Sequence, residues 1–295
     1  MKRDPKEILK KIRRIELRTR RLVNAVFAGQ YHSVFKGRGM NFEEVREYAP
    51  GDEIRSIDWN VTARMNAPYI KKYTEERELT VMLMVDVSAS GVFGSVELSK
   101  RELAAEVASI LAFSAIHNND KVGLILFTDR IELFIPPKKG RLHTLRLIRE
   151  MLFFEPKGRG TELAFAVDYL NHVITRRSVV FLISDFLAED FDKTLTVAAK
   201  RHDLVAMPVV DPGESRLPDV GIVTFEDPET GEQIDINTSS RAVRQELARL
   251  NEERLRDLEK LLRSRRIDSV RLSTDEDYLV ALRNFFEARE RRLAA

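Results

Sequence analysis

The sequence contains no cysteine among its 295 residues. Disulfide bonds, thiolate metal sites and cysteine nucleophiles are therefore excluded, and the absence is compatible with a reducing compartment. Long apolar runs are missing as well: stretches such as residues 110–116 are far shorter than the roughly 20 residues that a membrane-spanning helix needs. Charges continue near the N-terminus where a signal peptide would place its apolar stretch. We therefore expect a cytoplasmic protein.

Charge is plentiful but unevenly distributed. Charged residues make up 33% of the chain and hydrophobic residues 43%, enough for a folded core. The net charge of +2 conceals a segment, residues 1–21, that carries +7 while the remainder carries −5. The spacing of Ile8, Ile12 and Ile15 predicts a basic helix within residues 1–30. That helix could pack on the body, or bind an acidic lipid surface, nucleic acid or an acidic partner.

The next segment, residues 31–77, is interrupted by glycine and proline and contains the only tryptophan, Trp59. Its short apolar stretches predict strands and turns, so we expect a small β-rich N-terminal subdomain. Trp59 is expected in its core together with Ile57 and Phe42.

From residue 78 the pattern alternates between strands and helices. Strands are predicted at 81–85, 121–127, 131–135, 179–184, 204–210 and 268–272, with helices at 99–117, 142–153, 162–174 and 190–200 between them. Strands that are apolar along their whole length indicate a parallel sheet covered on both faces. We therefore predict that residues 78–295 form a doubly wound, mostly parallel α/β domain. A hairpin signal within 216–239 indicates an insertion, and the form Ser273-x-x-Glu276 predicts a capping box.

Polar side chains cluster where the predicted strands end. Asp86, Ser88 and Ser90 follow the first strand of this domain, Asp185 follows another, and Thr161 precedes a helix. Because ligands bind outside the carboxyl ends of parallel strands, these five oxygen donors are expected at one site. Such donors suit Mg²⁺, Mn²⁺ or Ca²⁺. The alternative for each residue is a helix cap, and we expect Asp129 and Asp211, which also follow strands, to be turn or cap residues.

The order of these residues resembles the metal-ion-dependent adhesion site of von Willebrand factor A domains. That site has the pattern of Asp86-x-Ser88-x-Ser90, followed by a loop threonine and then by a strand-end aspartate. This resemblance covers about residues 78–295. It implies that the hydroxyls bind the metal directly or through water, and that the aspartates often act through waters. It also implies an open coordination position that takes a carboxylate from a partner protein.

A second resemblance covers nearly the whole chain. Gly37-Arg38-Gly39, Pro50-Gly51-Asp52, Ile57-Asp58-Trp59 and Ser184-Asp185-Phe186 are similar to motifs of the bacterial family called domain of unknown function 58. Its members are often encoded beside ATPases of the MoxR type, a branch of the AAA+ class. The resemblance therefore implies a MoxR-type ATPase as partner, with this chain as a chaperone-like adaptor.

Several enzyme classes lack their residues in this chain. The sequence has no Gly-x4-Gly-Lys-Ser/Thr loop, no His-Glu-x-x-His and no Gly-x-Ser-x-Gly, and Asp86-x-Ser88 lacks the second carboxylate of aspartyl-phosphate phosphatases. We therefore predict a non-enzymatic, metal-dependent protein-interaction module. Two alternatives stay open: a metal-dependent hydrolase in which Asp86 and Asp185 hold the ion, and an adaptor that uses the basic residues 1–21.

Overall fold

The computed structural model describes residues 34–35, 41–65, 67–74 and 78–294. Residues 35–79 form one compact unit, and residues 80–295 belong to the other. The predicted basic N-terminal helix lies outside the described residues, so its expected acidic partner stays a prediction.

The smaller unit contains an antiparallel pair of strands, β1 (Asn41–Glu47) and β2 (Tyr69–Thr74), joined through η2 (Ile54–Ser56) and the short helix α3 (Trp59–Met65). The prediction that Trp59 belongs to its core is wrong, since this side chain is 67% exposed. A two-stranded sheet with one short helix has little interior, and an indole needs a large one. Ile70 in β2 is buried.

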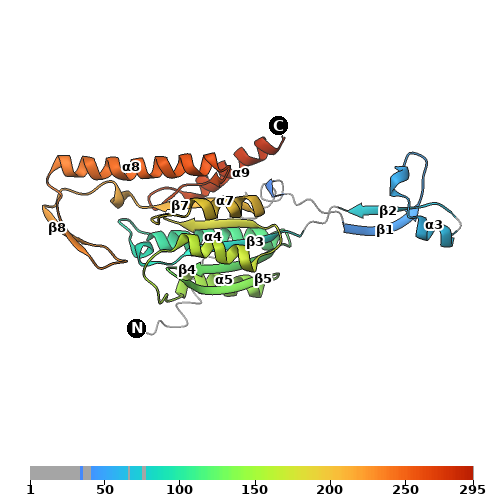
Figure 1. Cartoon of the computed structure of the whole chain (residues 1–295), viewed down its shortest axis with the longest axis horizontal. Coiled ribbons are helices and arrows are strands. Elements are labelled where there is room, and N and C mark those ends of the chain that lie inside the picture. The colour runs from blue at the N-terminus through green and yellow to red at the C-terminus, as the bar shows by residue number, and fades with distance from the viewer. Residues whose placement is uncertain (1–33, 36–40, 66, 75–77, 295) are drawn as a thin grey trace. The chain divides into compact units, whose positions relative to one another are not determined.

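The larger unit is built on one sheet with the strand order β10-β7-β6-β3-β4-β5, and β11 also pairs with β7 (Figure 1). The strands are β3 (Thr80–Asp86), β4 (Lys121–Phe127), β5 (Ile131–Lys138), β6 (Val179–Ser184), β7 (Asp203–Val210), β10 (Asp268–Ser269) and β11 (Leu272–Ser273). All pairings are parallel except that of β5, the edge strand. The predicted doubly wound, mostly parallel α/β fold is confirmed.

Helices cover both faces of this sheet. The helices are α4 (Lys100–His117), α5 (Arg141–Phe153), α6 (Leu163–Val173), α7 (Asp192–Arg201), α8 (Arg241–Ser264) and α9 (Tyr278–Ala294). On one face, α6, α7 and the end of α8 pack on alternate strand residues such as Met82, Met84 and Leu182. On the other, α4 packs on β3 and β4 and against α5, and the hydroxyl of Tyr278 in α9 donates to Glu106 in α4.

A capping box of this domain begins α4, and none forms at Ser273. The hydroxyl of Ser99 accepts from the amide of Glu102, whose carboxylate accepts in turn from the amide of Ser99. The predicted box at Ser273 is wrong because Ser273 belongs to β11. Helix α9 begins five residues later, and the carboxylate of Asp277 accepts from the amide of Leu279 at its first turn.

A hairpin of β8 (Ile222–Glu226) and β9 (Gln233–Asn237) precedes α8. Apolar side chains on its outer surface are exposed to solvent: Ile222 is 73% exposed and Ile234 is 62% exposed. The two strands form a separate small sheet, so the hairpin is not an extension of the central one (Figure 1).

Candidate functional site

The neighbouring strands β3 and β6 both end at polar residues of the predicted site. Asp86 is the last residue of β3, and Ser184 is the last residue of β6, directly before Asp185. One carboxylate oxygen of Asp86 accepts from the amide of Ser88 at 2.9 Å, and the other accepts from the hydroxyl of Ser184 at 2.7 Å. The parallel pairing of β3 with β6 places these groups side by side, as the sequence predicts.

Four of the five predicted residues line one cavity. Asp86, Ser88, Ser90 and Asp185, which we call the strand-end site, surround a space of about 10 Å³, room for roughly one water molecule. All four residues are buried. The hydroxyl oxygens of Ser88 and Ser90 are 3.0 Å apart and share a hydrogen bond. Hard oxygen donors therefore converge on a space of the size of one small ion or water.

The first residue of α4 brings a cation to the strand-end site. The Lys100 ammonium donates to Asp185 at 2.8 Å and to Glu214, in the 3₁₀ helix η4 (Pro212–Glu214), at 2.6 Å. The Lys100 side chain is only 4% exposed, so both ion pairs are largely shielded from water. A lysine at a helix N-terminus is opposed by the helix dipole, and here the two carboxylates stabilise it.

Burial and neighbouring charges together shift the pKa values of Asp86 and Lys100. Burial first, and then the negative charge of Asp185, raise the pKa of Asp86 to about 6, against the effect of hydrogen bonds from Ser88 and Ser184. Burial alone would lower the pKa of Lys100, but Asp185 and Glu214 outweigh it and hold that pKa above its ordinary value. The site thus has three carboxylates and one ammonium, an excess of negative charge that a divalent cation would offset.

The loop before α6 is fixed against the loop that carries the serines. The amide of Ala89 donates to the carbonyl of Arg159 at 2.9 Å. Gly158 cannot be replaced without a rearrangement, because a Cβ there would lie 2.0 Å from a carboxylate oxygen of Asp129. Its amide donates to Glu132 at 2.6 Å. The two loops meet, as the sequence predicts.

Thr161 is the predicted residue that does not line the cavity. Its hydroxyl instead donates to the carboxylate of Glu229 at 2.8 Å. Glu229 lies in the turn of the β8–β9 hairpin and is half-buried. Burial first, and further the charge of Asp185, raise the pKa of Glu229, while the bond from Thr161 lowers it. The hairpin therefore brings another carboxylate within electrostatic range of the strand-end site.

The residues found only in the structure are Lys100, Glu214 and Glu229. One available signal for Lys100 was a lysine at the start of a helix whose second half is apolar nearly all round. The contact of Glu229 joins residues 68 positions apart and has no local signature. Asp211 does cap η4, as expected, by accepting from the amide of Gly213. Asp129 pairs with the exposed Arg130.

The strand-end site fits a hard divalent cation better than a soft one, since its donors are carboxylates and hydroxyls. Among the residues that the structure describes, no three His, Cys, Asp or Glu side chains form a group that could hold a metal ion. A cation here would therefore depend on the two serine hydroxyls in addition to Asp86 and Asp185. The excess negative charge and the small polar cavity both suit such an ion.

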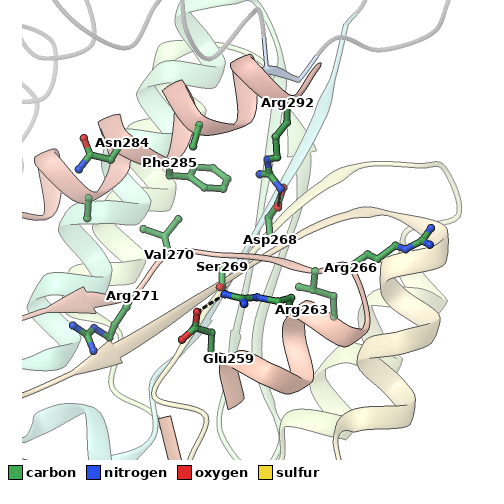
Figure 2. A pocket seen from close by; sticks show the side chains of 13 residues that line it. Glu259, Arg263, Arg266, Asp268, Ser269, Val270, Arg271, Asn284, Phe285 and Arg292 are labelled. Atoms are coloured by element: carbon green, nitrogen blue, oxygen red, sulfur yellow. Dashed lines mark hydrogen bonds and ion pairs between the residues drawn. The ribbon is translucent and has the colours of Figure 1, made fainter. Parts of the chain in front are cut away.

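A larger hollow of about 680 Å³ lies elsewhere, between the end of α8, strand β10 and α9 (Figure 2). Its walls combine Phe285 and Val270 with several arginines. Arg292 forms an ion pair with Asp268, and Arg263 forms one with Glu259. No residue of the strand-end site lines this hollow.

Fold and site together define an α/β protein with a buried carboxylate and hydroxyl cluster at the carboxyl ends of parallel strands. The family described as protein of unknown function DUF58 matches residues 44–256. The chain belongs to this family, so the resemblance drawn from its motifs is confirmed.

The chain is also similar to other proteins and to solved structures. Uncharacterized protein Rv1480 of Mycobacterium tuberculosis is 32% identical over 291 residues, 98% of this chain and 91% of that protein. YeaD of Bacillus subtilis is 25% identical and matches 50% of this chain and 34% of its own length. The conserved hypothetical protein BatB from Bacteroides thetaiotaomicron has a TM-score of 0.46 and 19% identity, covering 72% of this chain and 99% of that one. The SpRpn10 VWA domain has a TM-score of 0.39 and 12% identity, covering 70% and 95%.

Within the described residues, no helix combines the length and apolar character needed to cross a membrane.

Proposed function

We propose that this protein is a non-enzymatic, metal-dependent protein-interaction module. The observation that carries the proposal is the convergence of Asp86, Ser88, Ser90 and Asp185 around one small cavity. These residues would hold Mg²⁺, or Mn²⁺ or Ca²⁺, and Thr161 is the further ligand that the sequence predicts. When bound, the ion supplies a position that accepts a carboxylate from a partner protein.

Lys100 matters for this role because of its charge. Asp86, Asp185 and Glu214 carry three negative charges, and Lys100 compensates one of them. A divalent ion would bring the cluster close to neutrality, so that a partner carboxylate would not be repelled. The hydroxyls of Ser88 and Ser90 bond to each other, and the Ser88 side chain also bonds to the Asp86 carboxylate, so the oxygen donors lie close enough to surround one ion.

The proposed partner is a MoxR-type AAA+ ATPase, supported by the membership in the DUF58 family. The first test is calorimetric titration of the purified chain with Mg²⁺ and Mn²⁺, followed by binding to a purified MoxR-type ATPase. We expect metal binding and partner binding in the wild type, and loss of both in Asp86→Ala. Asp129→Ala is the matched control, since Asp129 also follows a strand of the sheet but pairs with Arg130. Partner binding that survives EDTA would refute the metal-dependent role, and metal-dependent turnover of phosphoesters would refute the non-enzymatic one.

A further inference from the structure

The β8–β9 hairpin is a separate small sheet whose tip reaches a loop near the strand-end site. Glu229 accepts a 2.8 Å hydrogen bond from Thr161, a residue that the sequence predicts as a metal ligand. The other carboxylate oxygen of Glu229 lies 3.6 Å from the position of a Cβ built on Gly160. The Glu229 carboxylate thus contacts the loop of Gly160 and Thr161, which a partner's carboxylate would approach.

The turn is constructed to present this side chain. One carboxylate oxygen of Asp227 accepts from the amides of Glu229 at 2.8 Å and Thr230 at 3.4 Å. The amide of Gly231 donates to the carbonyl of Asp227 at 2.8 Å, and Gly231 has a φ of 76°, which favours glycine. These bonds fix the turn from within, so Glu229 is directed outward from it toward Thr161.

The pairing of the hairpin strands does not attach them to the central sheet. Within the part of the chain that the structure describes, the hairpin strands pair only with each other, and Ile222 and Ile234 remain largely exposed. An isolated two-stranded hairpin has marginal stability, so its position depends on a few contacts such as the one between Glu229 and Thr161.

We propose that Glu229 is an internal ligand of the strand-end site and takes the place of a partner's carboxylate. The partner therefore presents a glutamate or aspartate on an exposed turn, and it binds by displacing the hairpin tip. This inference rests on the proposed metal-dependent function, since the ion is what both carboxylates would compete for. It extends that function by assigning a role to the hairpin.

The first test is amide hydrogen exchange of residues 222–237 in the full chain, with Mg²⁺ and with EDTA. We expect Mg²⁺ to slow exchange in the wild type, and Glu229→Ala to exchange about fivefold faster and without a response to Mg²⁺. Glu232→Ala is the matched control, since Glu232 lies on the same exposed turn. It should behave like the wild type.

The second test uses a cyclic peptide with the sequence of residues 226–233 as the probe for an acidic turn. With Mg²⁺ it should bind Glu229→Ala at least about tenfold more tightly than the wild type, because the internal competitor is gone. Its version with glutamine at the position of Glu229 should not bind.

The outcomes separate this inference from the function on which it rests. Mg²⁺ that binds the chain while hairpin exchange and peptide binding are the same in wild type and Glu229→Ala would overturn the internal ligand alone. Absence of Mg²⁺ binding to both proteins would overturn the proposed function and the internal ligand together.

Discussion

Asp86 is a buried carboxylate whose ionisation destabilises the metal-free fold. Its pKa of about 6 lies above the ordinary 3.8, so the folded state binds the proton more tightly than the unfolded chain does. The Asp86 contribution to the free energy of unfolding therefore falls as pH rises from about 4 to 6. We expect Asp86→Asn to stabilise the chain above pH 7 in EDTA by on the order of 1–3 kcal/mol, measured by urea unfolding.

Asp129→Asn is the control for this prediction because the pKa of Asp129 is shifted the other way. The hydrogen bond from Arg130 lowers that pKa, so neutralising Asp129 should give no stabilisation. If Asp86→Asn were less stable than the wild type in EDTA, the claim that Asp86 carries an uncompensated charge would be wrong. A buried negative charge that is kept at a cost in stability is what the proposed cation site would require.

His202 gives the opposite pH dependence. It is 1% exposed, and within the described structure neither of its ring nitrogens has a hydrogen-bond partner. Burial, assisted by Arg201 and Arg177, lowers its pKa from 6.5 to about 4. The unfolded chain therefore binds the proton more readily, and stability falls as pH decreases from about 6.5 to 4.

Replacement of His202 should remove that loss. Between pH 8 and pH 5, the wild type should lose about 2 kcal/mol of unfolding free energy more than His202→Leu does. Urea unfolding at the two pH values measures the difference, and the pH 8 comparison corrects for any change in packing. Equal losses in both proteins would show that His202 is protonated or hydrated in the fold.

At the scale of elements, helix α4 connects the strand-end site to the core. Its first residue, Lys100, forms buried ion pairs with Asp185 and Glu214. Lys100→Met leaves both carboxylates uncompensated and should destabilise the chain by about 3–5 kcal/mol. Because the variant also removes a competing cation, Mg²⁺ should raise its melting temperature more than that of the wild type.

Lys200→Met is the matched control for Lys100→Met, since Lys200 is an exposed lysine in the last turn of α7. It should change stability little and should leave the response to Mg²⁺ unchanged. If Mg²⁺ stabilised Lys100→Met no more than the wild type, Lys100 would not share the site with the ion.

The part of the strand-end site that follows directly from the strand order could be predicted from the sequence. The apolar strands β3 and β6 are evident in the sequence, and parallel strands bring Asp86 and Asp185 to one edge of the sheet. The pattern could not predict that Thr161 is bonded to Glu229, or that Lys100 reaches Asp185, because both contacts depend on how distant elements pack. Side-chain partners across 68 or 85 residues leave no periodicity to detect.

At the scale of the whole molecule, prediction succeeds for the larger unit and fails for a residue of the smaller one. Continuous apolar strands and helices at 80–295 specify a large core, which a sequence pattern describes well. In the unit of residues 35–79 the same reasoning placed Trp59 inside, although a small unit has too little interior to bury every large apolar side chain. Hydrophobicity alone does not decide burial there.

Trp59 turns this small unit into a spectroscopic probe, because it is the only tryptophan of the chain. With 67% of its surface exposed, its fluorescence in the native protein should be quenched by acrylamide nearly as strongly as in 6 M urea. We expect the ratio of the two quenching constants to exceed about one half. A strongly protected Trp59 would show that another surface covers it in solution, and repetition of the measurement at several protein concentrations would separate cover by a second copy from cover within one chain.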